Sequence, residues 1–207
     1  MIKKEDHYKK IYNLYYIINI TYKHIIYYTI IMYLSIDVGI KNLAYIIYDT
    51  KIIQWKVIEL CETNANKANI IDLCKKMFVL FEKEFTNMHF KEVIIENQIG
   101  PSAIRMKSLQ GMITMYFINK NSDVVYWNSS NKLKRFIKKI TYKERKKLGI
   151  LVTSCIINEF YIEQEEYFLK HKKKDDLADC FLQLLDYLVK KDIIKENIFT
   201  NAINIKL

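Results

Sequence analysis

The stretch that decides the fold, YLSIDVGIKNLAY, spans residues 33–45. Its apolar residues at positions 34, 36 and 38 alternate with Ser35 and Asp37, and this period of two predicts a β-strand with one buried face. Gly39 opens a predicted turn, and a second apolar run predicts another strand over residues 43–48. The first strand therefore carries a carboxylate, Asp37, whose burial packing alone does not explain.

The rest of the chain extends this pattern with further strands and helices. Short turns join the first three strands, which predicts an antiparallel meander, and each later strand follows a helix, which predicts parallel additions to the sheet. The predicted fold is α/β, a five-stranded mixed sheet of three antiparallel strands then two parallel ones, flanked by helices. The expected strands are residues 33–38, 43–48, 52–60, 91–96 and 123–127, and the expected helices are residues 70–85, 131–140, 143–166, 175–189 and a helix capped by Ser102 that ends near residue 117.

Length and composition indicate one basic, globular domain. The chain has 207 residues, of which 51% are hydrophobic, enough for one domain with its own core. Its 33 basic and 23 acidic residues give a formal net charge of +10, which favours a polyanionic partner such as nucleic acid. The four cysteines form no C-x-x-C pair, which argues against structural zinc or a disulfide scaffold and favours a reducing, intracellular setting.

The first 31 residues do not fit the pattern of the rest. Residues 11–31 are apolar, but Lys23 and His24 near their middle make a membrane span costly, so we expect no membrane association. We interpret this part as an extension that activity does not require, with Met32 as an alternative start. The expected organisation is an extension at residues 1–31, one domain at residues 32–195 and a tail at residues 196–207.

Four carboxylates are candidates for a metal site. Asp37 lies within the first strand and Glu96 ends the buried fourth strand, so each needs a compensating charge. Asp176 and Asp179 are three residues apart on the last helix and share one face. Four converging carboxylates repel one another unless cations bind, and all-oxygen ligands suit Mg²⁺ or Mn²⁺. Two such ions about 4 Å apart can hold the attacking water and the leaving 3′ oxygen of a phosphodiester.

Each acid also has a purely structural interpretation. Asp37 could form the turn before Gly39, and Glu96 could end its strand and pair with a lysine. The two helix acids could be first-turn residues that the helix dipole stabilises, and with Gln183 and Asp186 they would form an ordinary polar face. The occurrence of all four acids in this order, on two strands and one helix, favours the metal site.

Three motifs in this chain resemble those of RuvC-type Holliday junction resolvases, and most closely the poxvirus branch. Asp37 lies in an I-D-x-G motif, VIIENQ carries Glu96, and DDLADCFLQL carries Asp176 and Asp179, with Cys180 where the family has Ala. The segments NQIGPSAIRMKSLQGM and SSNKLKRFIKKITYKERKK add to the likeness, which covers residues 32 to about 190. The resemblance implies a ribonuclease H-like fold and makes the four acids the catalytic ligands of two Mg²⁺ ions, for which Mn²⁺ can substitute.

The same resemblance carries expectations about activity and partners. It implies an endonuclease that binds four-way DNA junctions as a homodimer and nicks opposing strands symmetrically, with no small-molecule cofactor. In the poxvirus branch it also implies that concatemeric replication products are processed into unit genomes. Localisation to viral replication sites in the host cytoplasm would follow.

Basic residues gather in two segments that we expect to contact DNA. Lysine and arginine neutralise phosphates, and interleaved aromatic residues can stack on unpaired bases near a branch point. By family analogy Lys134, which follows Leu133, is the first candidate for a catalytic contact with the scissile phosphate, and Lys146 is the second. The predicted DNA contacts are Arg105, Lys107, Lys132, Arg135, Lys138, Arg145, Lys146, Lys173 and Lys174.

Two other functions remain open at this point. The opening I-D-x-G-x-x-N also resembles the first phosphate motif of actin-like ATPases and sugar kinases, although four glycines are too few for their other phosphate loops. A non-catalytic DNA-binding module of the same fold is the second alternative. ATP binding would support the first, and junction binding without cleavage would support the second.

Overall fold

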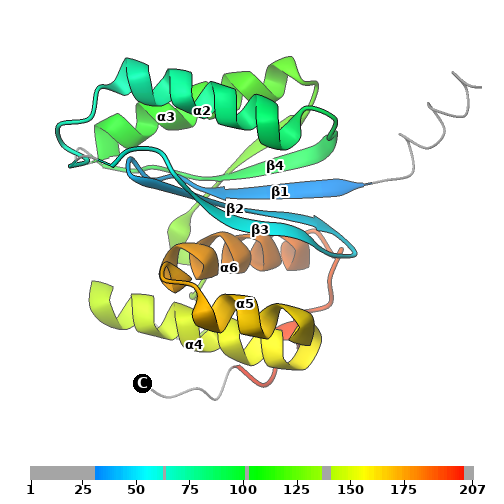
Figure 1. The fold of residues 1–207 in the computed structure, drawn as a ribbon. Coiled ribbons are helices and arrows are strands. Elements are labelled where there is room, and N and C mark those ends of the chain that lie inside the picture. The colour runs from blue at the N-terminus through cyan, green and yellow to red at the C-terminus, as the bar shows by residue number, and fades with distance from the viewer. Residues whose placement is uncertain (1–30, 63, 101–102, 137–140, 203–207) are drawn as a thin grey trace, which may run out of the picture. The chain divides into compact units, whose positions relative to one another are not determined.

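A single mixed sheet organises the computed structural model, which describes residues 31–62, 64–100, 103–136 and 141–202 (Figure 1). Its strand order is β3-β2-β1-β4-β5. β1 pairs antiparallel with β2, β2 pairs antiparallel with β3, and both β1–β4 and β4–β5 are parallel. The predicted sheet, three antiparallel strands followed by two parallel ones, is confirmed. The strands are β1 (Met32–Asp37), β2 (Asn42–Asp49), β3 (Lys51–Glu59), β4 (Phe90–Glu96) and β5 (Asp123–Trp127).

Helices cover both faces of the sheet. One face is covered by α2 (Ile70–Phe85) and α3 (Ile104–Asn119), and the other by α4 (Tyr142–Phe160), α5 (Glu165–Lys170) and α6 (Lys174–Lys190) (Figure 1). Two of these helices begin at caps that the sequence supplies. The side chain of Asn69 accepts from the first-turn backbone of α2, and Thr141 with Glu144 forms a capping box at α4.

The alternation of β1 divides its side chains between the two faces. Leu34 and Ile36 pack into the core beneath α2 and α3, whereas Tyr33 belongs to the core beneath α4 and α6. Ser35 lies on this second side, because its hydroxyl donates to the backbone carbonyl of Cys180 in α6 at 2.9 Å. Since successive strand side chains point to opposite faces, Asp37 also lies on the α6 side.

The turn between β1 and β2 requires glycine at position 39. A Cβ atom placed there would lie 2.4 Å from the backbone oxygen of Asn42, a distance that real Cβ atoms do not reach. The close approach lets β2 start at Asn42, only five residues after Asp37. The turn therefore returns the chain alongside β1 immediately after the first acidic residue.

Two helix predictions were wrong in part. Residues 131–136, expected to start a helix, form the end of a 3₁₀ turn (Ser129–Asn131) and further turns, while residues 137–140 lie outside the described residues. Tertiary contacts override helix propensity here, because Lys132 and Arg135 bind acidic side chains elsewhere in the fold. The helix expected at residues 143–166 is interrupted where Tyr161 takes a non-helical backbone conformation, and α5 follows separately.

The C-terminal end of the chain is partly described by the structure, whereas the predicted N-terminal extension is almost wholly outside it. The tail expected at residues 196–207 begins instead with a 3₁₀ helix, Glu196–Phe199, whose Ile198 and Phe199 are buried in the core. Apolar burial therefore extends the domain past the predicted boundary. The predicted extension, residues 1–31, lies outside the described residues apart from Ile31, as does the predicted cap Ser102. Among the helices that the structure describes, none has the length and apolar character to cross a membrane.

Candidate active site

The ends of two neighbouring parallel strands bring the first two acids together. Ile36 of β1 is paired with Ile95 of β4, so the next residues along both strands, Asp37 and Glu96, lie side by side. Ile94 belongs to the core on the α6 side, and alternation therefore directs Glu96 to the same face as Asp37. The two carboxyl groups therefore lie close enough for the charge of one to affect the pKa of the other.

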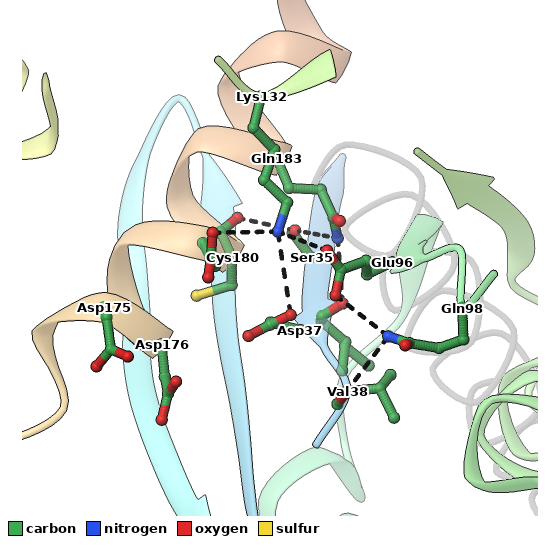
Figure 2. Close-up of polar contacts among 12 residues, drawn as sticks. Ser35, Asp37, Val38, Glu96, Gln98, Lys132, Asp175, Asp176, Cys180 and Gln183 are labelled. Carbon is green, nitrogen blue, oxygen red and sulfur yellow. Dashed lines mark hydrogen bonds and ion pairs between the residues drawn. The ribbon is translucent and has the colours of Figure 1, made fainter. Parts of the chain in front are cut away.

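A buried lysine lies among three of the predicted acids (Figure 2). The Nζ of Lys132 is 3.0 Å from Oε1 of Glu96, 3.4 Å from Oδ1 of Asp179 and 4.0 Å from Oδ1 of Asp37. Only 3% of its side chain is exposed. Charged hydrogen bonds of this kind offset the cost of removing the ammonium from water. One positive charge thus gathers carboxylates from β1, β4 and α6.

The pKa values of this group reflect burial and mutual charge. Burial raises the pKa of Asp37 well above its ordinary value. The charge of Lys132 opposes this rise, and the negative charges of Glu96 and Asp179 add to it. Burial also opposes ionisation of Glu96 and Asp179, but nearby ammonium groups hold both pKa values below their ordinary range. Burial lowers the pKa of Lys132, yet the three carboxylates outweigh it and the net shift is upward. Of the three acids around Lys132, Asp37 is therefore the one whose ionisation burial opposes most strongly.

A second lysine binds the acids at the start of α6. The Nζ of Lys146, on α4, donates to Oδ2 of Asp179 at 2.7 Å and is 3.4 Å from Asp175 and 3.8 Å from Asp176. Burial raises the pKa of Asp176, and the adjacent Asp175 adds to this. Figure 2 shows Asp175 and Asp176 to one side of the group around Lys132. The site therefore has two parts, joined by Asp179, which contacts both lysines.

Buried amides hold the supporting elements in register. The Nε2 of Gln183 lies 3.0 Å from the Ser35 hydroxyl, 3.1 Å from the carbonyl of Ile36 and 3.2 Å from that of Ile94. Gln183 is one turn beyond Asp179 on α6, so it links this helix to the two strands that end in acids. Gln98 supports the other side, donating to Oε2 of Glu96 at 3.1 Å.

The carboxylate oxygens of the site are donors that suit an oxygen-ligated cation, and they come from three separate elements. Three carboxylate oxygens from separate elements already lie within 4.0 Å of one positive nitrogen, that of Lys132. Carboxylate oxygens are the ligands that Mg²⁺ and Mn²⁺ prefer. In the part of the chain that the structure describes, however, no three or more Asp, Glu, His and Cys side chains lie close enough together to hold a metal ion as they stand. Ammonium groups supply the compensating charge in this arrangement.

The predicted basic residues fall into three groups. Lys132 and Lys146 lie among the acids, whereas Lys134, the first candidate for the catalytic lysine, is exposed and makes none of the ion pairs that the structure describes at the site. Arg135 was predicted to contact DNA, but its side chain faces inward and binds Asp186. Lys138 lies outside the described residues. The other predicted contacts are exposed or half-buried: Arg105, Lys107, Arg145, Lys173 and Lys174.

Sequence reasoning missed the depth at which several polar residues lie. Gln183 is fully buried and Asp186 is 2% exposed, so the interpretation of an ordinary solvated face on α6 was wrong. The signal available was their place among Phe181, Leu184 and Leu188, but the three-residue spacing to the helix acids suggested a polar stripe instead. Lys132 was predicted as a DNA contact but lies buried among the acids, because the family analogy directed the choice of the catalytic lysine to Lys134.

Comparison with known proteins identifies a viral family. Residues 30–191 match the family described as Poxvirus A22 protein. The Holliday junction resolvase of Fowlpox virus (strain NVSL) is 30% identical over 165 residues, which cover 76% of this chain and 94% of the relative. An uncharacterized protein of Acanthamoeba polyphaga mimivirus is 33% identical over 139 residues, 56% of this chain and 33% of that relative, so the chain matches about a third of its length.

Solved structures agree with the fold. The crystal structure of the Fowlpox virus resolvase with its substrate Holliday junction DNA has a TM-score of 0.59 and 26% identity, covering 78% of this chain and 99% of that one. Thermus thermophilus RuvC in complex with a Holliday junction substrate has a TM-score of 0.55 and 10% identity, covering 79% and 97%. The predicted ribonuclease H-like fold, in its RuvC-like form, is confirmed.

Proposed function

The chain belongs to the Poxvirus A22 protein family, and from this premise we propose that it is an endonuclease that resolves four-way DNA junctions. The observation that carries the proposal is the convergence of Asp37, Glu96 and Asp179 on one buried positive charge at the ends of β1 and β4. A buried cluster of this charge density has no role in packing. Phosphodiester hydrolysis is the chemistry that such a cluster supports best.

Each residue of the cluster has a role in this reaction. Asp37, Glu96, Asp176 and Asp179 would hold two Mg²⁺ ions, with Mn²⁺ as a substitute, and these ions supply an activated water and charge neutralisation when bound. Lys132 and Lys146 place ammonium groups where a phosphate would enter, and they stabilise the charge that develops on its oxygens. Gln183 and Gln98 keep the carboxylates in position through the backbone of β1 and β4 and through Glu96.

The DNA path follows the exposed basic residues around this site. Arg145 and Lys173 are exposed and can reach phosphates, and Lys174 beside them is half-buried. Arg105 is half-buried, and Lys107 lines the groove between α2 and α3 instead. Contacts of this kind give an affinity that falls steeply with salt, because each releases counterions. We expect these residues to set affinity and the acidic cluster to set rate.

A homodimer would place two such sites on one junction. The outer side of α2 and α3 supports this proposal, because it exposes large apolar side chains around a groove: Phe78 (55% exposed), Met112 (42%) and Met115 (64%). Monomeric soluble proteins rarely expose contiguous apolar patches of this kind. We propose that a second copy covers this surface, so that paired sites can nick opposing strands.

The family also supports a biological role. We propose that the chain converts concatemeric viral replication products into unit genomes at replication sites in the host cytoplasm. Residues 1–31 are proposed to be dispensable for this activity, so a chain that starts at Met32 should cut as fast as the full chain. A slower shortened chain would contradict that part of the proposal.

The deciding experiment is a cleavage assay with four-way junction, flap and linear duplex DNA, with and without Mg²⁺. We expect paired, symmetric nicks in the four-way junction that require metal and that Asp37→Asn abolishes. Tight junction binding without cleavage under any metal condition would support a non-catalytic module instead. ATP binding detected by calorimetry, with no junction binding, would point to the kinase-like alternative.

A further inference from the structure

A second ion pair, between Arg135 and Asp186, lies outside the acidic cluster. Its acid, Asp186, is on α6, the helix that also carries Asp179. Asp186 is 2% exposed, and its Oδ1 accepts from the Arg135 guanidinium at 2.8 Å while its Oδ2 accepts from the Trp127 indole at 2.9 Å. A buried carboxylate needs such partners, because an uncompensated charge there is strongly destabilising. The charge therefore fixes where Arg135 and Trp127 can lie.

Arg135 is also held from its other side. Its guanidinium lies 3.9 Å from the centre of the Phe199 ring, and Phe136 packs edge-on against the same ring at 5.9 Å. Phe199 is 1% exposed and belongs to the 3₁₀ helix near the C-terminus. The stacking closes a small cluster, here called the Asp186 anchor, which consists of Arg135, Asp186 and Phe199.

The position of the Asp186 anchor relates directly to the active site. Asp186 follows Asp179 by seven residues on α6, two turns along the same side of the helix and about 10 Å away. Arg135 follows Lys132 by three residues in a segment of tight turns, in which Lys134 N donates to Asn131 O and Phe136 N donates to Leu133 O. Lys132 binds Asp179 and Arg135 binds Asp186, so this short segment is attached to α6 at two points.

We propose that the Asp186 anchor is a positioning device that keeps the Lys132 ammonium among Asp37, Glu96 and Asp179. Arg135, Asp186 and Phe199 touch neither the acids of the site nor the reacting atoms, and act through Lys132. The segment around Lys132 has no helix or strand of its own to hold it, since it consists of turns. A fixed contact three residues away supplies the missing rigidity. The inference deepens the proposed nuclease function and rests on it for its catalytic consequence.

The test removes the ion pair as a unit. Replacing both partners, Arg135→Met with Asp186→Leu, avoids a lone buried charge and lets the full chain fold. The matched control is Tyr187→Phe, which removes the hydrogen bond from the neighbouring tyrosine hydroxyl to Glu92 while leaving Lys132 and its segment untouched. Both variants perturb a buried polar contact of α6, so a loss of stability alone is expected to affect them alike.

The first measurement does not depend on nuclease activity. Acylation of surface amines, followed by mass spectrometry of the metal-free protein, reports how accessible each lysine is. In the wild type and in Tyr187→Phe, Lys132 should react far more slowly than the exposed Lys134. In the double variant its reactivity should rise toward that of Lys134. Unchanged protection of Lys132 in a folded double variant would overturn the inference, whatever the protein does to DNA.

The second measurement separates positioning from DNA binding. At saturating protein, the single-turnover cleavage rate of the double variant should fall by up to about 100-fold, the size of effect that a displacement of about 1 Å can have on an active-site group. The junction Kd should stay near the wild-type value, because Arg135 faces inward. A weakened Kd with an unchanged single-turnover rate would show that Arg135 is a DNA contact and would overturn the inference. If the wild-type chain cuts no junction, the proposed function fails while the labelling result still decides the anchor.

Discussion

The two faces of the sheet are built on different principles. The core between the sheet and α2 and α3 is apolar, with Leu34, Ile36 and Phe81 among its fully buried side chains. The core on the α4–α6 side also contains Ser35, Gln183 and Asp186, all buried and all polar. Apolar packing stabilises both faces, and the second face also holds charged and polar groups at fixed positions.

The difference extends to the outer surfaces of the helices. On α3, Met112 and Met115 are exposed although the opposite side of the helix is buried, so large apolar side chains also lie on its outer side. On α6, nearly every residue from Leu177 to Leu188 is buried. Exposed apolar side chains on a helix are typical of a surface that binds another protein. Buried, hydrogen-bonded polar residues instead fix the positions of the elements that they join. This difference is the basis of our proposal that the α2–α3 face serves assembly and the other face serves chemistry.

Replacement of Asp37 should have the largest effect. Asp37→Asn removes a carboxylate that we propose as a metal ligand, and junction cleavage should fall by at least about 100-fold, measured under single-turnover conditions. Binding should be retained or tightened, because a negative charge beside the phosphate is lost. A variant that cuts at the normal rate would contradict the assignment of this residue.

The same substitution should stabilise the metal-free protein. Because the pKa of Asp37 is raised in the folded chain, its favourable contribution exists at low pH and is lost as the pH rises through that pKa. At neutral pH the ionised form therefore costs stability, and Asn removes the cost. Thermal unfolding in a metal chelator should show a higher Tm at pH 7 and a smaller difference at low pH. A lower Tm at pH 7 would contradict this sign.

Two lysine variants test which lysine acts in cleavage: Lys132, which the structure places among the acids, or Lys134, which the family analogy favours. Lys132→Met removes the ammonium that contacts three acids, whereas Lys134→Met removes an exposed one. Cleavage should fall by about 10- to 100-fold for Lys132→Met, and much less for Lys134→Met, when rates are compared at saturating protein. The opposite ranking would restore Lys134 as the lysine at the scissile phosphate.

The assembly face can be tested separately from the catalytic face. Met115→Glu places a charge on the exposed apolar side of α3 and should convert a dimer to a monomer in sedimentation analysis, with a loss of paired nicks. The control is Leu151→Glu, which adds the same charge at an exposed position of α4 on the other face. Dissociation of both variants, or of neither, would remove the α2–α3 surface as the proposed interface.

The smallest expected effect concerns Gln183. Gln183→Met keeps the volume but leaves the carbonyls of Ile36 and Ile94 without their donor, at a cost of about 1–3 kcal/mol in the free energy of unfolding. Denaturant unfolding measures this cost. Leu188→Met, a volume-conserving change in the same apolar core, should cost less. Equal losses would mean that Gln183 contributes packing alone.

The parts of the fold that the sequence predicts are those set by periodicity. The alternation through Ser35 and Asp37 separates the two sides of β1, and the motifs indicate the four acids, of which Asp37, Glu96 and Asp179 meet at Lys132. Lys132 and Arg135 were predicted to contact DNA, but they bind Glu96 and Asp186 instead. These pairings depend on contacts between distant segments that no local pattern encodes. The segment around Lys132 has helix-forming residues, and two ion pairs with α6 outweigh that preference.

The parallel pairing of β1 with β4, and the position of α6 behind both, have a consequence for synthesis of the chain. The acids come from residues 37, 96, 176 and 179, so the last two are synthesised long after the strands that carry the first two. Domains fold as units, and a nascent chain that lacks α6 has neither Asp179 nor the Gln183 contacts that align the two strands. A truncated product of translation is therefore expected to be harmless to the DNA around it, since cutting begins only with a completed domain.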